Sequence, residues 1–260
     1  MNKIIMGNEN RESFSKVPEL TFIFWVIKIL ATTLGETGGD ALSMSMNLGY
    51  LVSTGIFAVI FAAAVVVQVR AAKFHPVIYW VTIVATTTVG TTLADFADRS
   101  LGIGYAGGSA ILCGLLLASL VVWKFTLGSV AVDSVSSPKS EIYYWVTIMC
   151  SQTLGTALGD WTADTQGLGY GGGIFVFGGM LVVVAALYFL TKISRTVLFW
   201  LAFILTRPLG AVVGDFLDKP RDHGGLALSR YSASATLLAL MLVCIFAFPH
   251  RPAKQAEVAG

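Results

Sequence analysis

Long apolar stretches, each close to 20 residues, recur along the chain and are separated by short polar connections. About 20 mostly apolar residues form an α-helix long enough to cross the hydrocarbon core of a bilayer. The pattern therefore predicts an all-α integral membrane protein with eight transmembrane helices. The predicted spans are Leu20–Asp40, Tyr50–Arg70, Val77–Asp95, Tyr105–Lys124, Ile142–Asp160, Tyr170–Thr191, Thr196–Asp215 and Tyr231–Phe248.

The spans leave little sequence for a soluble domain, so we expect a single transmembrane domain over residues 20–249. An N-terminal tail, residues 1–19, and a C-terminal tail, residues 250–260, flank it. The segment from Met1 to Pro18 is polar and shows no cleavable signal peptide. The first apolar segment is therefore expected to remain as a membrane span.

A two-helix unit repeats four times, over approximately residues 20–73, 74–128, 139–193 and 194–249. In each unit a tryptophan opens the first span, a glycine follows ten residues later and an aspartate fifteen residues later. Successive tryptophans are 55, 65 and 55 residues apart, which indicates that a pair of units was itself duplicated. The tryptophans are Trp25, Trp80, Trp145 and Trp200, and the aspartates are Asp40, Asp95, Asp160 and Asp215.

A unit of two spans returns to its starting side, so the four units are parallel repeats. We expect a pseudo-fourfold or two-by-two bundle in which the odd-numbered spans line the axis and the even-numbered spans face lipid. Basic residues favour the cytoplasmic side of a membrane. The tails and between-unit loops hold eleven (Lys3, Arg11, Lys16, Arg70, Lys73, Lys124, Lys139, Lys192, Arg195, Arg251 and Lys254), and the within-unit loops hold four (Arg99, Lys219, Arg221 and Arg230).

This asymmetry predicts a multi-pass membrane protein with both termini in the cytoplasm and the repeated aspartates at the outer, periplasmic or extracellular, side. The tyrosines that open the second helix of the first three units, Tyr50, Tyr105 and Tyr170, fit an interfacial belt, and the tryptophans fit another at the opposite end.

Each odd-numbered span carries a polar stripe and, beside it, a row of small residues. Counted from the tryptophan, polar residues at positions 7, 11 and 15 share one helix face. Small residues at positions 10 and 14 allow helix backbones to approach closely in a membrane. The expected pathway-lining residues are Thr32, Thr87, Thr91, Gln152 and Thr156, and the expected packing residues are Gly35, Gly39, Gly90, Gly155, Gly159, Gly210 and Gly214.

The four repeated aspartates and Glu36 are the candidate cation ligands. Neighbouring carboxylates repel each other, so in a poorly hydrated place they need a bound cation, a basic partner or protons. Carboxylate and hydroxyl oxygens suit a hard divalent cation such as Mn²⁺, Mg²⁺ or Ca²⁺. We expect Asp40, Asp95, Asp160 and Asp215 to form an outer metal-binding ring, with Glu36 deeper. The alternative, given equal weight, is that each aspartate only ends or caps a helix.

Two basic residues lie within the predicted spans. Arg207 falls near mid-membrane, where a charged side chain is costly and needs a partner. Glu36 would serve if the first and fourth units are neighbours. Arg207 is then either a counter-charge with a gating or proton-coupling role or a simple tie between two helices. Lys28 lies three residues from Trp25 and is expected to extend to the cytoplasmic interface.

Composition excludes several classes of protein. The chain is 55% hydrophobic and 12% charged, with a mean hydropathy of +0.76, whereas soluble domains carry about 25% charged residues. An ordinary cytosolic enzyme, a disordered regulator and a nucleic-acid binder are therefore excluded. The cysteines, Cys113, Cys150 and Cys244, are expected to be reduced packing residues. Known catalytic motifs are absent from the sequence, so we expect no enzyme, although an intramembrane enzyme using the aspartates stays a third hypothesis.

The units W…TLG-x-x-x-GD…LGY resemble a group of bacterial proteins known as uncharacterised membrane-anchored proteins. The resemblance runs from Phe22 to Phe248 and is weakest in the fourth unit, at Arg207-Pro208 and at Leu228–Tyr231. It implies an integral inner-membrane protein and carries no established activity.

The carboxylates themselves lead us to expect a membrane transporter of a cation, a divalent metal ion in the first place, with exchange for protons as a further option. Its partners would be the lipid bilayer and an inorganic cation, with no nucleic acid and no required cofactor. The alternative is a non-transporting membrane scaffold or partner subunit whose polar stripes only pack helices.

Overall fold

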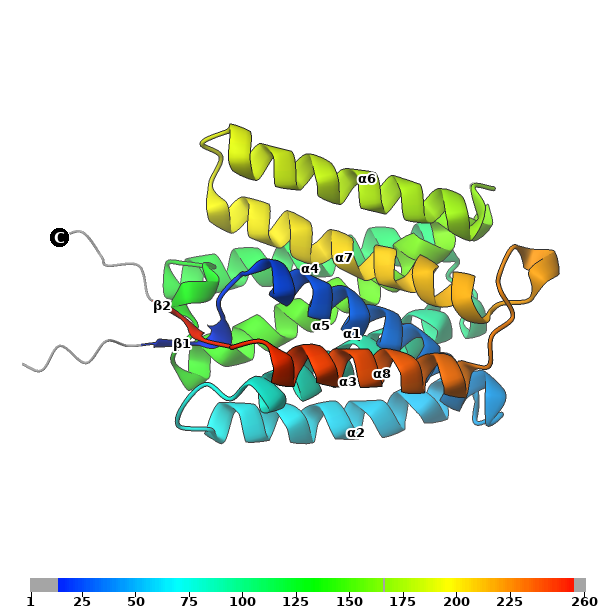
Figure 1. Cartoon of the computed structure of the whole chain (residues 1–260), viewed down its shortest axis with the longest axis horizontal. Helices are drawn as coiled ribbons and strands as arrows, with labels where there is room; N and C mark the ends of the chain where they lie inside the picture. Colours follow the sequence, from blue (N-terminus) through cyan, green and yellow to red (C-terminus); the bar gives the residue numbers. More distant parts are fainter. Residues whose placement is uncertain (1–13, 166, 255–260) are drawn as a thin grey trace, which may run out of the picture.

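The computed structural model describes residues 14–165 and 167–254, which form eight long helices and one short sheet (Figure 1). The predicted all-helical class is confirmed, and one helix falls in each predicted span. The helices are α1 (Phe22–Asp40), α2 (Gly49–Arg70), α3 (Pro76–Asp95), α4 (Tyr105–Leu127), α5 (Pro138–Asp160), α6 (Gly169–Leu190), α7 (Arg195–Asp218) and α8 (Arg230–Ala247).

Local sequence signals explain several helix ends. The Thr21 side chain accepts a hydrogen bond from the backbone N–H of Phe24 and so caps the start of α1. Ser137 and Ser140 form a capping box at the start of α5, where a proline occupies the first turn. Gly128 ends α4 in the left-handed conformation, with φ at 77°, that glycine adopts without a steric penalty.

Four inner helices close into a ring, and four outer helices cover it. Each inner helix packs against two others, in the order α1, α3, α5, α7 and back to α1. Each outer helix packs on the inner helix of the next repeat: α2 on α3, α4 on α5, α6 on α7, and α8 on α1. The inner helices are mostly buried and the outer helices are mostly exposed. The odd-numbered helices therefore surround the central axis.

One contact, repeated four times, brings the inner helices together. The glycine at position 10 of each inner helix faces the position-7 side chain of the next one, so closely that a Cβ on the glycine would collide with it. The pairs are Gly35 with Thr87, Gly90 with Gln152, Gly155 with Arg207, and Gly210 with Thr32. At position 14 the same relation joins Gly39 to Thr91, Gly159 to Ala211, and Gly214 to Glu36. All seven predicted packing glycines thus lie in contacts between inner helices.

An aromatic layer fills one end of the ring. Trp80, Trp145 and Trp200 are buried and pack edge-on against the aromatic residues that precede them in the sequence. The hydroxyls of Tyr79 and Tyr144 lie 2.7 Å apart within this layer. The prediction of an interfacial tryptophan belt is therefore wrong for these three residues. Equivalent positions on converging helices bring the rings together inside the bundle, where they bury more apolar surface.

A two-stranded antiparallel sheet, which the sequence analysis did not predict, joins the two ends of the described part of the chain. Strand β1 (Phe14–Pro18) pairs with β2 (Pro252–Lys254) at the same end of the ring as the aromatic layer. Lys16 extends from β1 and forms a 2.6 Å ion pair with Glu141 of α5. The sheet holds α1 next to α8, which no loop connects. Of the tail residues in the charge count, Lys3 and Arg11 lie outside the described residues.

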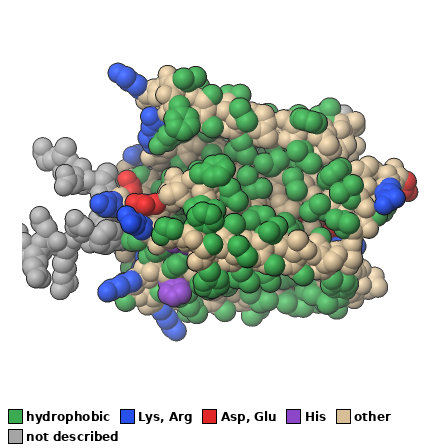
Figure 2. All heavy atoms as spheres, viewed as in Figure 1, with side chains coloured by type: hydrophobic (Ala, Val, Ile, Leu, Met, Phe, Trp, Pro, Cys, Tyr) green, Lys and Arg blue, Asp and Glu red, His purple; other side chains and the backbone are tan. Residues whose placement is uncertain are grey.

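Apolar side chains cover the visible flank of the molecule, and charged side chains gather at its two ends (Figure 2). All the helices except α1 and α5 are long and apolar enough to cross a membrane by length and composition. The polar residues of α1 and α5 face the other inner helices. Nine basic residues in the described chain ends and between-repeat loops lie at the sheet end, against four at the opposite end.

The inner-helix contact can be tested with Gly90→Ala. A Cβ at this position lies 3.0 Å from the backbone of Gln152 and Thr153, which cannot move without shifting α5. We expect a loss of about 1–3 kcal/mol in the free energy of unfolding, measured by thermal unfolding of the purified protein. The control is Gly114→Ala in α4, where a Cβ meets nothing within 4 Å; it should be neutral or stabilising by up to about 1 kcal/mol. Equal melting temperatures for the two variants would contradict the model of ring packing.

Candidate functional site

Six buried carboxylates gather at the end of the ring opposite the sheet. Each inner helix brings its position-15 aspartate there, α1 adds Glu36 one turn earlier, and α7 adds Asp218 at its end. All six residues are at most 7% exposed. The set is Glu36, Asp40, Asp95, Asp160, Asp215 and Asp218. We call it the acidic chamber.

A π-helical turn follows directly after the repeated aspartate in three repeats. The turns are Ala41–Ser45, Phe96–Ser100 and Trp161–Thr165, and each begins at the residue after the aspartate. Single π turns inside helices are rare and are frequent at functional sites. In the fourth repeat, α7 continues in α geometry to Asp218. The last repeat therefore differs from the others at the chamber itself.

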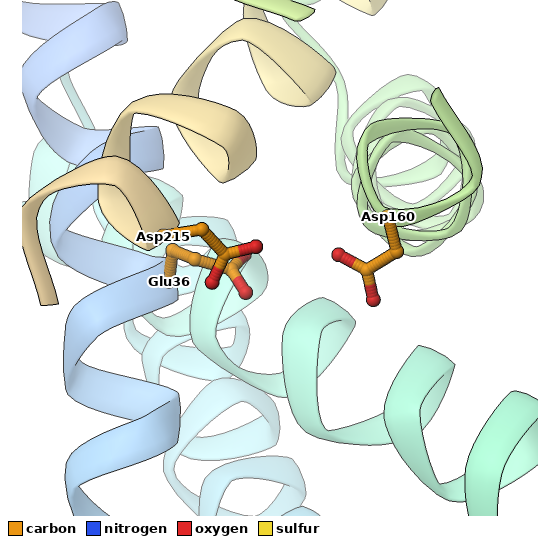
Figure 3. A group of neighbouring side chains, drawn as sticks. All are labelled: Glu36, Asp160 and Asp215. Atoms are coloured by element: carbon orange, nitrogen blue, oxygen red, sulfur yellow. The ribbon is translucent and has the colours of Figure 1, made fainter. Parts of the chain in front are cut away.

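The carboxylates converge closely enough to form two candidate cation groups. One oxygen each from Glu36, Asp160 and Asp215 lie within 4.8 Å of one another, and Figure 3 shows Asp160 directed toward the other two. A second group, with the same spacing, consists of Asp40, Asp215 and Asp218. Of the four residues predicted to form the outer ring, three thus belong to these groups. Asp95 belongs to neither.

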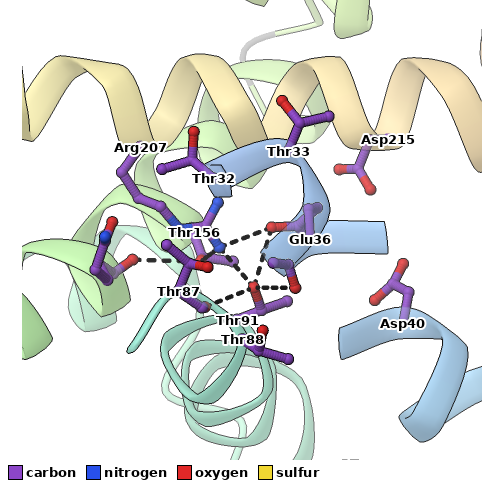
Figure 4. Close-up of polar contacts among 12 residues, drawn as sticks. Thr32, Thr33, Glu36, Asp40, Thr87, Thr88, Thr91, Thr156, Arg207 and Asp215 are labelled. Atoms are coloured by element: carbon purple, nitrogen blue, oxygen red, sulfur yellow. Dashed lines mark hydrogen bonds and ion pairs between the residues drawn. The ribbon is translucent and has the colours of Figure 1, made fainter. Parts of the chain in front are cut away.

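Arg207 links four inner helices at the deep end of the chamber (Figure 4). Its Nη2 shares its two hydrogens among three acceptors, namely Oε2 of Glu36 at 2.8 Å, the hydroxyl of Thr91 at 2.6 Å and the hydroxyl of Thr156 at 2.5 Å. The side chain is completely buried. Glu36 is therefore the partner of Arg207 that the sequence suggested, and the first and fourth repeats are neighbours in the ring.

The other predicted lining residues have different surroundings. The hydroxyl of Thr32 donates to the backbone carbonyl of Thr206 at 3.1 Å, and that of Thr87 donates to the carbonyl of Ala31 at 3.2 Å. These two threonines tie neighbouring helices together. The side chain of Gln152 is buried, and its amide nitrogen and oxygen have no hydrogen-bond partner in the described part of the chain.

Three basic residues that the sequence analysis counted only as loop charges bind the aspartates. Arg99 lies 3.0 Å from both Asp95 and Asp160, through Nε and Nη2 respectively. Lys219 Nζ lies 2.5 Å from Asp40 and 3.1 Å from Asp215. The third, Arg230, lies 3.1 Å from Asp218. The spacing could have revealed two of them, because Arg99 and Lys219 each follow the aspartate of their own repeat by four residues.

The charge on Lys219 depends on these partners. Burial disfavours the ammonium form, but the neighbouring carboxylates of Asp215 and Asp40 outweigh burial and hold the pKa of Lys219 well above its usual value. Lys219 therefore remains a cation at neutral pH.

Lys28 does not extend to the interface, so this prediction is wrong. Its Nζ is completely buried, lies 4.1 Å from the centre of the Phe203 ring, and has no hydrogen-bond partner among the residues that the structure describes. The aromatic layer explains the difference, because it occupies the route from Lys28 to the near end of the helix. A cation over a ring face retains some electrostatic stabilisation.

A hollow of about 560 Å³ lies outside the acidic chamber. Its lining includes Arg99, Lys219 and Arg230, the three bases that bind the aspartates, together with Asp164. The bases therefore lie between the hollow and the buried carboxylates. A ligand entering from this end meets the bases first.

The fold and the site define a class of protein: four two-helix repeats closed into a ring, with an acidic chamber at one end. The chain belongs to the family described as Repeat of Unknown Function (DUF347), which matches residues 23–74, 78–129, 143–194 and 198–252. These four matches confirm the internal repeats and the uncharacterised repeat family that the sequence indicated. No curated protein and no solved structure matches the chain.

The Arg207–Glu36 pair can be tested with a double-mutant cycle. Glu36→Gln leaves a buried guanidinium without its counter-charge and should lower the free energy of unfolding by about 3–5 kcal/mol. Arg207→Met should have a similar cost, and the double variant should be much less destabilised than the sum of the two. Thermal unfolding of the four proteins provides the measurement. Additive effects would show that the two residues do not stabilise each other.

The variant Lys28→Met should not lose stability, in contrast to the variants of Glu36 and Arg207, because Lys28 has no hydrogen-bond partner among the described residues. Methionine keeps the contact with Phe203 and removes a buried ammonium that lacks a hydrogen-bond partner. We expect a melting temperature equal to or above that of the wild type, with a gain of up to about 2 kcal/mol. The control is Lys124→Met near the end of α4, where the ammonium is exposed and a change within about 0.5 kcal/mol is expected. A clear loss of stability for Lys28→Met would mean that the charge of Lys28 is needed.

Proposed function

We propose that this protein crosses the bacterial inner membrane with all eight helices and transports a cation, a divalent metal ion of the Mn²⁺, Mg²⁺ or Ca²⁺ type. The nine basic residues at the sheet end support an orientation with both termini in the cytoplasm, which places the acidic chamber at the outer side. The polar residues of α1 and α5 do not oppose insertion, because the other helices cover them.

The observation that carries the proposal is the charge imbalance in the chamber. Six buried carboxylates face four basic side chains, namely Arg99, Arg207, Lys219 and Arg230. Two ionised carboxylates 4.8 Å apart repel each other by about 3 kcal/mol at an effective dielectric constant of about 20. The excess negative charge therefore favours the binding of cations or protons. Release of a bound cation or proton would require the ion pairs of the chamber to rearrange.

The donor atoms favour a hard cation. Glu36, Asp160 and Asp215 offer three carboxylate oxygens. The hydroxyl oxygens of Thr91 and Thr156 lie nearby, because both accept hydrogen bonds from Arg207, the partner of Glu36. Oxygen ligands of this kind suit Mg²⁺, Ca²⁺ and Mn²⁺ better than a soft metal. Carboxylates that accept a proton when the metal leaves would also couple metal movement to proton movement.

The two ends of the ring suggest how passage is controlled. At the outer end the hollow leads to the bases that bind the aspartates. At the cytoplasmic end the aromatic layer, with Trp80, Trp145 and Trp200, fills the interior. Transport would require a second conformation in which this layer separates.

The test is metal movement in proteoliposomes, followed with a Mn²⁺-quenched fluorophore inside the vesicles. Asp160→Asn and Asp215→Asn should each lower the transport rate by about tenfold or more, because each removes one charged ligand. The matched control is Asp222→Asn in the outer loop, whose side chain is 79% exposed and outside the chamber. It should transport at the wild-type rate.

A scaffold role is the alternative, because the same ion pairs also tie neighbouring helices together. It predicts that Asp160→Asn and Asp215→Asn lower the melting temperature and that Mn²⁺ has no effect on the melting temperature of the wild type. Full transport by both variants, or no transport by the wild type, would rule out the cation transporter. The transporter proposal, in contrast to the scaffold alternative, predicts that Mn²⁺ binds the folded wild-type protein and raises its melting temperature.

A further inference from the structure

Arg99 and Lys219 occupy equivalent places in the second and fourth repeats. Each follows the aspartate of its own repeat by four residues, and each also contacts the aspartate of the next repeat in the ring. The first and third repeats have Met44 and Asp164 at this position. Each of these two repeats therefore supplies its position-15 aspartate to the chamber but no base. The helices thus follow a fourfold pattern, whereas the ion pairs of the chamber follow a twofold pattern.

Lys219 lies where a metal ion would bind. Its ammonium contacts Asp40 and Asp215, and oxygens of these two residues and of Asp218 lie within 4.8 Å of one another. The side chains of Asp40 and Asp218 are almost completely buried, and Oδ1 of each has no hydrogen-bond partner among the residues described. The group therefore already holds the Lys219 ammonium, with Arg230 paired to Asp218 beside it, and it retains two oxygens without a hydrogen-bond partner in the described chain.

The two bases can leave, in contrast to Arg207. The side chain of Arg99 is 31% exposed and that of Lys219 is 11% exposed, and both line the outer hollow. Long, flexible basic side chains can extend toward water, and an incoming cation would compensate the buried carboxylates that they leave. Arg207 is completely buried and bonded to three other helices, so it has no such route.

We propose that Lys219 and Arg99 are resident cations at two related positions in the ring, from which an incoming divalent ion must displace them. Lys219 occupies the site formed by Asp40, Asp215 and Asp218, and Arg99 occupies the site formed by Asp95 and Asp160. This inference rests on the proposed function, because it assumes that the carboxylates of the chamber bind a cation. It adds that the chamber takes up two ions and that the affinity for these ions is set by competition with Lys219 and Arg99.

The two sites differ in strength. Lys219 holds its carboxylates with one ammonium, whereas Arg99 uses two nitrogens of a rigid guanidinium, each 3.0 Å from its aspartate. An arginine that bridges two carboxylates in this way is held more firmly than a lysine. The Lys219 site also has a third carboxylate, Asp218, which is paired with Arg230 through Oδ2 and leaves Oδ1 unpartnered among the described residues. Metal should therefore displace Lys219 first.

The affinity for Mn²⁺ of the purified full-length protein, measured by electron paramagnetic resonance of free Mn²⁺, tests the competition. Lys219→Gln should raise the affinity by about tenfold, because removal of the competing charge leaves the carboxylates to the metal. Arg99→Gln should raise the affinity of a second, weaker site. Lys219→Arg, which keeps the charge, should bind no more tightly than the wild type. The control is Arg221→Gln, which removes one exposed positive charge from the same end and should leave the affinity within about twofold.

A second measurement uses the wild-type protein and does not depend on the folding of a variant. If Mn²⁺ displaces Lys219 into the hollow, then acetylation of Lys219 by an amine-reactive reagent, followed by mass spectrometry, should increase when Mn²⁺ is present. Acetylation of Lys73, in the loop at the opposite end, should not change.

The outcomes separate this inference from the proposed function. Suppose that the wild type binds and transports Mn²⁺, that Lys219→Gln and Arg99→Gln do not change the affinity, and that Mn²⁺ does not change the acetylation of Lys219. The resident-cation inference is then wrong and the transport proposal stands. If Lys219→Gln binds Mn²⁺ and the wild type does not, then the lysine is a permanent occupant and the transport proposal fails. If none of the proteins binds Mn²⁺, both are overturned.

Discussion

The close approach of four inner helices at their glycines is the contact on which the rest of the structure depends. A glycine at position 10 removes the side chain that would hold its neighbour away, and the position-7 side chain of that neighbour fills the space. Because the same contact closes α7 against α1, the ring needs no separate closing element. The polar stripes are brought to one axis as a consequence, and the acidic chamber exists because the ring is tight.

The tight ring also explains why charge is retained inside an otherwise apolar molecule. A buried carboxylate is costly unless a cation or a donor compensates it. Here Arg207 compensates Glu36 from inside the ring, and Arg99 and Lys219 compensate the aspartates from its outer edge. These pairs cross from one repeat to the next, so they stabilise the same interfaces that the glycines create. What remains uncompensated after this pairing is a net negative charge at one end of the axis.

The sequence could predict those features that repeat. The four units, the eight helices, the packing glycines and the partner of Arg207 all follow from residues at fixed offsets from a tryptophan. The exceptions depend on the surroundings of single residues. Lys28 has the spacing of an interfacial lysine, yet the aromatic layer confines it beside Phe203. The bases Arg99 and Lys219 stand after the last polar position of the stripe, so they read as loop charges until the π turns and the helix ends fold them back over the aspartates. The terminal sheet brings together strands more than 230 residues apart, and no local pattern in either strand marks that pairing.

The packing of each outer helix on the inner helix of the next repeat gives the chain an unusual topology. Three of these pairs are joined by a loop at the sheet end, and the fourth, α8 with α1, is joined there by the pairing of β1 with β2. The pair of strands therefore occupies a position equivalent to an ordinary interhelical connection. A circular permutation that linked the two strands and opened the chain between α4 and α5 would keep every helix contact, so the order in which the repeats are joined is independent of the architecture they build.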